Sequence, residues 1–512
     1  MSGPTWCEGL DTVAVVRVNG QEAGRTANMH RTYRFQVRDL LREGSNTLQV
    51  SFRAPYAYAE EQQERHGARP GPYDEPYPFI RKMACNFGWD WGPTLVTSGI
   101  WRPIGLHSWS GARLAEVRPH VRGDGVDVHV RVERTGDAPV TVTADVAGVS
   151  VETKLQQGES EAVLRLDVPD AERWWPRGYG AQPLYPLTVR AGADQWRREI
   201  GFRTVELDQD AFRLIVNGRP VFVRGYNWIP EDCFPARTTP ERLAERFGQA
   251  TGSGANALRV WGGGVYESED FYSLADRMGL LIWQDFPFAC SAYPEEEPFR
   301  SEVEAEARDN VARLAAHPSL ALWCGNNENI EGHQHWDWRE PLGDKSWGAG
   351  FYYDLLPGIV AELDPTRPYW PGSPYSGAPD RDVHDPRPAP STSGPCGGRA
   401  TTRTTPTTRR ASWPSSASRG RRRTPRCGRP SPTSRWRRTR PGSCTTRRRS
   451  TATPSCCRGW ASTCRGPRRS TTGTTTRSST RPGRWRSGSS GSGRSCRTAW
   501  GPWCGSSTTA GR

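Results

Sequence analysis

The last quarter of the sequence lacks most of the twenty amino acids. Between Pro386 and Arg512 there is no Leu, Val, Ile, Phe, Asp, Glu, Lys or Tyr, and all 127 residues are Pro, Ala, Ser, Thr, Gly, Cys, Arg or Trp. Without large aliphatic side chains, burial cannot offset the entropy of ordering the backbone, which is about 1–2 kcal/mol per residue. We therefore expect residues 386–512 to form a disordered, low-complexity tail.

The eight amino acids of this tail share a coding property. Each can be encoded with G or C at the middle codon position, and the third positions of a GC-rich gene become middle positions when the reading frame slides by one base. The alternative is a natural basic disordered tail, although six tryptophans are unusual for one. We interpret residues 386–512 as an out-of-frame translation, so function must be sought in residues 1–385.

The two parts also differ in charge. The tail holds 29 of the 69 Lys and Arg residues and none of the 55 Asp and Glu, so residues 1–385 carry a formal net charge of −15, against +14 for the whole chain. This excess of acidic residues argues against nucleic acid or an anionic membrane as a partner. No stretch is long and apolar enough to span a membrane, and we expect no signal peptide. The start runs almost at once into a predicted strand, which suggests that an upstream piece is missing.

The cysteines before the tail show neither paired nor metal-ligand spacing. This pattern favours reduced, mostly buried thiols in a cytoplasmic protein. The five residues are Cys7, Cys85, Cys233, Cys290 and Cys324.

Residues 1–385 fall into three segments by their pattern. Residues 1–108 and 109–205 contain short period-2 apolar runs separated by turns, such as VAVVRVNG, which ends on the hairpin signal Asn19–Gly20. These segments predict two antiparallel β-sandwiches. Residues 206–385 alternate strands with helices, which predicts a parallel sheet.

The third segment also predicts where the strands and helices lie. Strands are expected at VFVRGYNW (221–228), ANALRVWGGG (255–264), LLIWQDF (280–286) and LALWCGNNE (320–328), and RPYWPGSP (367–374) begins a fifth. Helices are expected after the caps Thr239 and Ser268 and from about Pro298 to Ala316. Polar and aromatic residues follow the strands, as at the active face of a (β/α)8 barrel. Residues 206–385 are thus predicted to form the first half of such a barrel.

One carboxylate stands out at the strand ends. Glu328 follows an apolar strand and two asparagines, a setting that suits general acid/base work on a glycoside, although most such glutamates are ion-paired loop residues. Arg259 and Asp285 end two neighbouring strands and form either a structural ion pair or a pair that orients a catalytic carboxylate.

Tryptophans are abundant near the same strand ends. Their faces stack on sugar rings, although half or more of them are expected to be core residues. The five are Trp261, Trp283, Trp323, Trp336 and Trp338. In the first segment, FGWDWGP (87–93) is either a turn packed on the core or a loop that reaches into the mouth of the barrel.

These residues lie in motifs that resemble family 2 glycoside hydrolases and, among them, the β-mannosidases. The motifs run in order through nearly all of residues 1–385: FGWDWGP, GIWRPI (99–104), WWPRGYGAQPLYPL (174–187), RGYNWIPED (224–232), RVWGGGVYE (259–267), IWQDFPFAC (282–290) and LWCGNNE (322–328). The resemblance implies a sugar-binding-type jelly-roll sandwich at 1–108, truncated at its N-terminus, an immunoglobulin-like sandwich at 109–205 and an incomplete (β/α)8 barrel at 206–385.

The resemblance also implies a reaction and a set of site residues. The expected activity is retaining removal of terminal β-linked mannose from oligosaccharides by two glutamates, without a metal or organic cofactor. Glu328 matches the acid/base and Asn327 the residue that bonds the 2-hydroxyl. The remaining pocket positions are Trp89 and Asp90 of the sandwich loop and the aromatic walls Trp261 and Trp336, with Arg259 beside them.

The second glutamate, the nucleophile, is missing. One of the sequences that the segment ASWPSSASRG (411–420) can encode in the shifted frame is RFVAEFGFQG, in which Ser415 stands where that nucleophile is expected. The chain as written is therefore predicted to be inactive. Another family 2 exo-glycosidase and a non-catalytic carbohydrate-binding remnant stay open as alternatives, as do the linkage, the aglycone and the oligomeric state.

Overall fold

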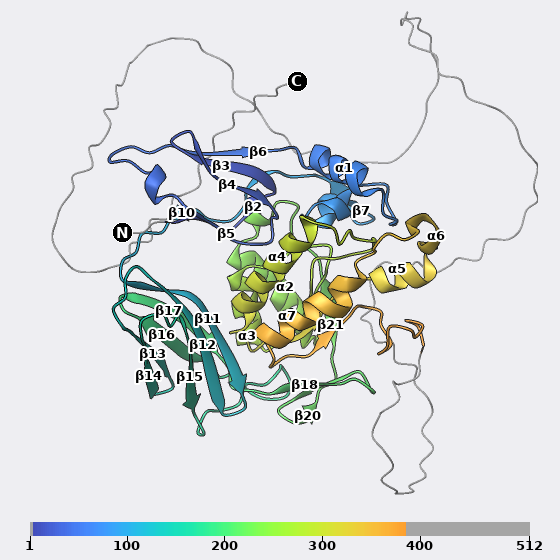
Figure 1. Cartoon of the computed structure of the whole chain (residues 1–512). Helices are drawn as coiled ribbons and strands as arrows, with labels where there is room; N and C mark the ends of the chain where they lie inside the picture. The colour runs from blue at the N-terminus through green and yellow to red at the C-terminus, as the bar shows by residue number, and fades with distance from the viewer. Residues whose placement is uncertain (1–3, 386–512) are drawn as a thin grey trace, which may run out of the picture. The chain divides into compact units, whose positions relative to one another are not determined.

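The computed structural model describes residues 4–385 (Figure 1). Its first segment contains two three-stranded antiparallel sheets with the strand orders β10-β1-β5 and β4-β3-β6. The strands are β1 Pro4–Cys7, β3 Val13–Val18, β4 Gln21–Ala27, β5 Tyr33–Gln36, β6 Leu48–Phe52 and β10 Ile104–Leu106. Asn19 and Gly20, with φ of 52° and 84°, form the predicted turn between β3 and β4.

Two short strand pairs complete this segment. β2 Leu10–Asp11 pairs with β9 Gly99–Ile100, and β7 Phe87–Trp89 pairs with β8 Gly92–Thr94. The second pair is a tight hairpin formed by the motif FGWDWGP.

The prediction of strands and turns throughout residues 11–108 was wrong for one stretch. Residues Pro55–His66 form helix α1, and the 3₁₀ turns Tyr77–Phe79 and Ala84–Asn86 follow it. Pro55 at the first helical position and the run of Ala, Glu and Gln behind it favour a helix. The helix packs on β7, where the rings of Tyr56 and Phe87 lie 5.0 Å apart (Figure 1).

The second segment is the predicted pair of antiparallel sheets. One has the order β11-β12-β15 (Ala112–Arg122, Gly125–Arg134 and Glu161–Asp167), and the other has the order β14-β13-β16-β17 (Val149–Leu155, Val140–Val146, Tyr185–Ala191 and Asp194–Ile200). Alternate residues of β12, from Val126 to Val132, are buried between the sheets. A small sheet of β18 Val205–Asp208, β19 Arg213–Val216 and β20 Arg219–Pro220 follows.

The third segment is a parallel sheet whose five strands follow one another in chain order. They are β21 Gly225–Trp228, β22 Ala257–Val260, β23 Leu281–Asp285, β24 Leu320–Cys324 and β25 Tyr369–Trp370. The last of them confirms the fifth strand expected in RPYWPGSP. Strand order that follows chain order is what successive βα units produce.

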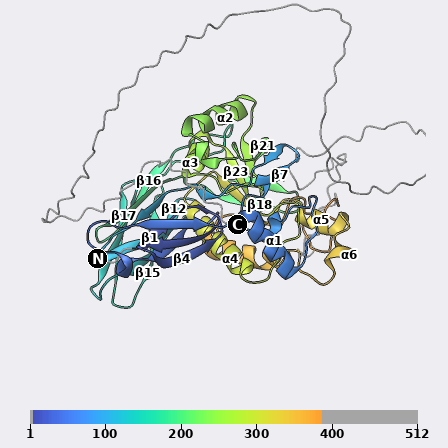
Figure 2. The same ribbon diagram turned by 90° about the horizontal axis from the view of Figure 1, so that it is seen from above.

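Helices connect these strands. They are α2 Pro240–Gly252, α3 Glu269–Met278, α4 Phe299–Leu314, α5 Asn329–His335, α6 Arg339–Leu342 and α7 Leu356–Leu363, the last preceded by the π-helical turn Phe351–Leu355, and a 3₁₀ turn spans Pro235–Arg237. Helices α2 and α3 lie side by side (Figures 1 and 2). The predicted caps are confirmed, because Thr239 accepts a hydrogen bond from the backbone N–H of Arg242 and Ser268 from that of Phe271.

The predicted strand VFVRGYNW is shorter and more exposed than expected. Only Gly225–Trp228 is a strand, and Phe222 and Tyr226 are 66% and 52% exposed. The physical reason is position: within residues 4–385, β21 pairs only with β22 and is an edge strand. Apolar alternation alone does not distinguish an edge from a centre.

Some expectations fall outside what the structure describes. The tail 386–512, including Ser415, lies beyond the described residues. Within residues 4–385 all five cysteines are free thiols, and four of them are buried. None of the helices in this range is long and apolar enough to cross a lipid bilayer.

Candidate active site

Glu328 stands at the carboxyl edge of the parallel sheet. Beyond β24 the backbone of Asn327 bridges Ala289 on one side and Ser373 on the other. The backbone N–H of Glu328 donates to the carbonyl of Ser373 at 2.9 Å, and its φ of +66° turns the chain into α5. A left-handed conformation at a non-glycine residue is strained, and such strain concentrates at functional sites.

The two asparagines before Glu328 have different partners. Asn326 is fully buried and shapes the turn, because its Oδ1 accepts from the N–H of Asn329 at 3.0 Å and its Nδ2 donates to the carbonyl of Pro371 at 2.9 Å. The Oδ1 of Asn327 accepts from Arg259 at 2.9 Å instead. Asn326 is therefore structural, whereas Asn327 belongs to a side-chain network beside the carboxyl.

Arg259 and Asp285 form the buried ion pair that the sequence allowed. The Nη2 of Arg259 lies 2.7 Å from Asp285 Oδ2, and both side chains are almost fully buried. Asp285 also accepts from the indole N–H of Trp283 at 2.8 Å and from the backbone N–H of Gly262 at 3.1 Å. A side chain at Gly262 would meet the carbonyl of Phe288 at 2.5 Å, so glycine is needed for this close approach. Arg259, held by Asp285, thus orients Asn327.

The carboxyl of Glu328 has a thiol as its neighbour. The S–H of Cys290 donates to Glu328 Oε2 at 3.1 Å, and Asn327 Nδ2 donates to the Cys290 sulfur at 3.3 Å. Burial, followed by the nearby charge of Glu328, raises the pKa of the Cys290 thiol well above its usual value. Cys290 therefore stays protonated and acts as a donor.

The hairpin of the first segment reaches this site. Asp90 is exposed at its tip, and the rings of Trp89 and Trp91 approach Trp261, which directly follows β22, with centroid distances of 4.9 and 5.6 Å. The interpretation of FGWDWGP as a loop that reaches the strand ends is therefore the one that matches the structure.

The predicted pocket tryptophans share one apolar cluster. Trp261, Ala289 and Cys290 are buried in it, and Trp89 and Trp336 pack against it. Both Trp336 and Trp89 remain partly exposed. The structure thus brings together the aromatic residues that the sequence proposed for the pocket and places them beside the partner of Glu328.

The other tryptophans named at strand ends are core residues. Trp283, Trp323 and Trp338 are each 3% exposed or less. The indole N–H of Trp323 donates to Asp364 at 2.9 Å, and the Trp323 ring stacks on Phe286. This outcome agrees with the expectation that half or more of these residues belong to the core.

Sequence reasoning missed Tyr73. Its ring lies 5.0 Å from that of Trp89 in an edge-to-face arrangement, and it is 36% exposed. Burial and the charge of Asp90 raise its pKa, with smaller contributions from Cys290 and Glu328. Its loop, GPYDEPYPF (71–79), shows no periodic alternation of apolar and polar residues. Its aromatic content was therefore the only sequence signal that could have drawn attention to it.

The loop that carries Cys290 is held by the first segment. The backbone N–H of Ala292 donates to the carbonyl of Pro70 at 2.9 Å. Arg81 donates to the carbonyl of Pro287 at 2.9 Å while it pairs with Glu306 of α4 at 2.6 Å, and both charged groups are buried. The position of Cys290 therefore depends on residues far away in the sequence.

The described residues offer no cluster of ligands for a metal. Nowhere between residues 4 and 385 do three His, Cys, Asp or Glu side chains come together in an arrangement that could hold a metal ion.

Comparisons with known proteins agree on one family. Residues 6–102 match the family described as glycosyl hydrolase 2 galactose-binding domain-like, and residues 114–203 match glycosyl hydrolases family 2. Both segments are therefore similar to glycosyl hydrolase family 2.

The curated relatives narrow the likeness to one group within this family. A β-mannosidase of Capra hircus is 36% identical over 414 residues, and a probable β-mannosidase of Caenorhabditis elegans is 33% identical over 418. Each match covers 72% of this chain and 47% or 46% of the relative, so the chain spans about half the length of the curated relatives it matches.

A comparison with solved structures also finds similarity to a β-mannosidase. A β-D-mannosidase from Dictyoglomus thermophilum is 37% identical, with a TM-score of 0.72 over 76% of this chain and 50% of that one. An FMN-binding β-glucuronidase from Facaelibacterium prausnitzii L2-6 is 20% identical, with a TM-score of 0.53 over 72% of this chain and 53% of that one, and shares the fold alone.

Proposed function

We propose that the gene encodes an exo-acting β-mannosidase that removes terminal, non-reducing β-D-mannose from oligosaccharides in the cytoplasm. Residues 1–108 would be its sugar-binding-type sandwich, 109–205 its immunoglobulin-like sandwich and 206–385 the first half of its (β/α)8 barrel. The observation that carries this proposal is Glu328 at the carboxyl edge of the sheet, beside Asn327 and the tryptophan cluster. The names of the relatives support mannose as the sugar.

In this proposal Glu328 is the general acid and base. Its carboxyl protonates the departing sugar oxygen and later removes a proton from the attacking water, as in retaining glycosidases. Asn327, held by Arg259, bonds the 2-hydroxyl of the mannose. Trp261 and Trp336 provide aromatic walls, and the hairpin with Trp89 and Asp90 closes over the sugar.

The nucleophile is proposed to lie in the shifted frame. A retaining enzyme needs a second carboxyl about 5–5.5 Å from the first, and the decoded segment places it at Ser415. We expect the 512-residue chain to release no sugar from aryl β-mannosides. Sequencing the DNA at codons 385–390 and restoring the frame near Pro386 should yield an open reading frame with an AEFG-like segment; stop codons within a few dozen residues would contradict the frameshift.

The role of Glu328 is tested in the frame-restored enzyme with aryl β-mannosides of graded leaving-group pKa. Glu328→Gln should slow poor leaving groups far more than good ones, because only poor ones need protonation. Glu331→Gln is the matched control: Glu331 lies one turn further along α5 and pairs with His384 at 3.0 Å. Equal losses across the series would show that Glu328 is not the acid.

A second candidate is a carbohydrate-binding remnant without catalysis. The apolar cluster around Trp261, with the partly exposed Trp89 and Trp336 packed against it, favours this candidate, because aromatic faces stack on sugar rings. Calorimetric titration of the 512-residue chain with mannose tests this candidate, because a remnant should bind the sugar and absence of binding would contradict it. Release of the aryl group from aryl β-mannosides by the same chain would exclude it.

A further inference from the structure

A chain of hydrogen bonds links the buried ion pair to the candidate acid. Arg259 donates to Asn327 Oδ1 at 2.9 Å, Asn327 Nδ2 donates to the Cys290 sulfur at 3.3 Å, and the Cys290 S–H donates to Glu328 Oε2 at 3.1 Å. Asn327 is thus held by Arg259, and Cys290 is held by Asn327. The carboxyl of Glu328 is thus fixed by a thiol that can neither lose its proton nor turn freely.

The backbone conformation of Cys290 fixes the direction of its side chain. Cys290 is 5% exposed and has a φ of +53°, a conformation rare for a residue with a side chain. Its backbone N–H donates to the carbonyl of Asn327 at 2.9 Å, and its carbonyl accepts from the hydroxyl of Tyr77 at 3.1 Å. A strained residue that is bonded on both backbone sides has a defined side-chain direction.

A thiol is a weak donor, and this weakness is what a general acid requires. A charged or strong donor stabilises the ionised carboxylate and lowers its pKa. An acid that must carry a proton near neutral pH is therefore better positioned by a donor that contributes direction but little stabilisation of the charge.

We propose that Cys290 is a positioning residue for Glu328. Its S–H group holds Oε2 and so leaves the proton to be transferred at Oε1, from which it passes to the departing sugar oxygen. This role rests on the proposed function of Glu328, whereas the hydrogen bond itself does not.

The infrared S–H stretch of the full 512-residue chain tests the proposal. The band of Cys290 is identified by subtracting the spectrum of Cys290→Ala, or of Cys290→Ser should the alanine variant fail to fold. It should lie at lower frequency than the band of Cys324, whose S–H donates only to the backbone carbonyl of Asn326, at 3.4 Å. At alkaline pH, where the side chain of Glu328 is a carboxylate, the Cys290 band should shift to higher frequency in Glu328→Gln, because a neutral amide is a weaker acceptor than a carboxylate.

Cys324 is the matched control, because it is also buried and free. Its band should not move in Glu328→Gln. An unmoved Cys290 band, or equal shifts of both bands, would overturn the proposal. Acidification supplies a second measurement: protonation of Glu328 should raise the frequency of the Cys290 band alone, and a band that is constant down to acid pH would also overturn it.

The two proposals can fail separately. If the Cys290 band shifts as expected but the leaving-group series is flat, the hydrogen bond exists and Glu328 is not the acid. If the series shows selective losses for poor leaving groups but the band does not move, Glu328 is the acid and Cys290 does not position it.

Discussion

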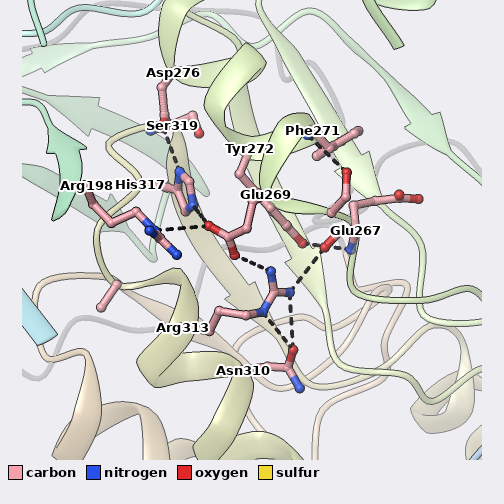
Figure 3. A network of polar contacts seen from close by, with 12 residues as sticks. Arg198, Glu267, Glu269, Phe271, Tyr272, Asp276, Asn310, Arg313, His317 and Ser319 are labelled. Atoms are coloured by element: carbon pink, nitrogen blue, oxygen red, sulfur yellow. Dashed lines mark hydrogen bonds and ion pairs between the residues drawn. The ribbon is translucent and has the colours of Figure 1, made fainter. Parts of the chain in front are cut away.

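Two polar clusters in and around the third segment differ in the groups that surround their glutamate. Around Glu328 the carboxyl is partly exposed, and its side-chain donor is a thiol. Between α3 and α4, Glu269 instead lies among three cationic groups: Arg313 at 2.7 Å, Arg198 at 3.5 Å and His317 at 3.5 Å (Figure 3). We call this second cluster the Glu269 network.

Within the Glu269 network, the contacts between the groups shift their pKa values toward the charged forms. Burial raises the pKa of Glu269, but the neighbouring His317 and the charge of Arg313 outweigh it and lower the pKa. Burial also opposes the charge on His317, but Asp276, 2.6 Å away, raises its pKa to about 9. The Glu269 network is held in its charged state by these contacts, whereas Glu328 has a neutral thiol as its hydrogen-bond donor.

The largest expected effect is in the Glu269 network. Asp276→Asn leaves the buried His317 cation without its closest carboxylate, and breaking a buried ion pair typically costs about 3–5 kcal/mol. Urea unfolding followed by tryptophan fluorescence should show a loss of this size.

Asp145→Asn is the matched control for this substitution. Asp145 of β13 pairs with Arg190 of β16 at 2.6 Å, and both side chains are partly exposed to solvent, where such pairs contribute about 1 kcal/mol or less. Similar losses for the two variants would contradict the structural role of the Glu269 network.

The pH dependence of stability sharpens the comparison. The folded-state pKa of His317, about 9, lies above its unfolded value of 6.5, so its stabilisation is full below pH 6.5 and disappears as the pH rises through 9. His317→Gln should therefore lose about 3 kcal/mol at pH 6 and little above pH 9.5, since one pKa unit corresponds to about 1.36 kcal/mol. Urea midpoints measured from pH 5 to 10 check this.

His129→Gln should show the opposite sign. Burial lowers the pKa of His129 to about 4, so the wild-type protein loses stability as the pH falls from 6.5 to 4, and the variant does not. The same pH trend for both variants would contradict the assignment of His317.

A smaller effect is expected at the helix that carries Glu269. Ser268 caps α3, and its hydroxyl accepts from the backbone N–H of Phe271 at 3.3 Å. Ser268→Ala should lower the free energy of unfolding by about 1 kcal/mol, and Ser268→Gly by only a few tenths. Equal losses for the two substitutions would show that the cap contributes nothing specific.

Much of this architecture could be predicted from the sequence because its signals are local. The caps Thr239 and Ser268, the turn at Asn19–Gly20 and the position of Glu328 after β24 each depend on a few adjacent residues. Helix α1 was missed because its helix formers follow Pro55 within a run interpreted as strands and turns. The helix propensities of the Ala, Glu and Gln residues in this run were the signal that would have predicted α1.

The inner part of the candidate site could not be predicted in this way. Cys290 and Asn327 are 37 residues apart, and Tyr73 comes from a different segment, so their proximity to Glu328 follows only from the fold. The sequence analysis interpreted Cys290 as one of several buried thiols. Nothing in its spacing distinguished it from Cys324.

The smallest effect on stability should come from Glu328 itself. Glu328→Gln keeps the shape of the side chain and an oxygen acceptor for the Cys290 thiol. Among residues 4–385 the carboxyl that it removes forms no ion pair, unlike that of Glu269. We expect the free energy of unfolding to change by less than about 0.5 kcal/mol, as for substitutions that break no buried network. Urea unfolding of Glu328→Gln and of Asp276→Asn under the same conditions measures the difference between the two losses of stability. A loss of several kcal/mol would mean that the carboxylate of Glu328 stabilises the fold as strongly as the Glu269 network does, and the distinction between the two clusters would fail.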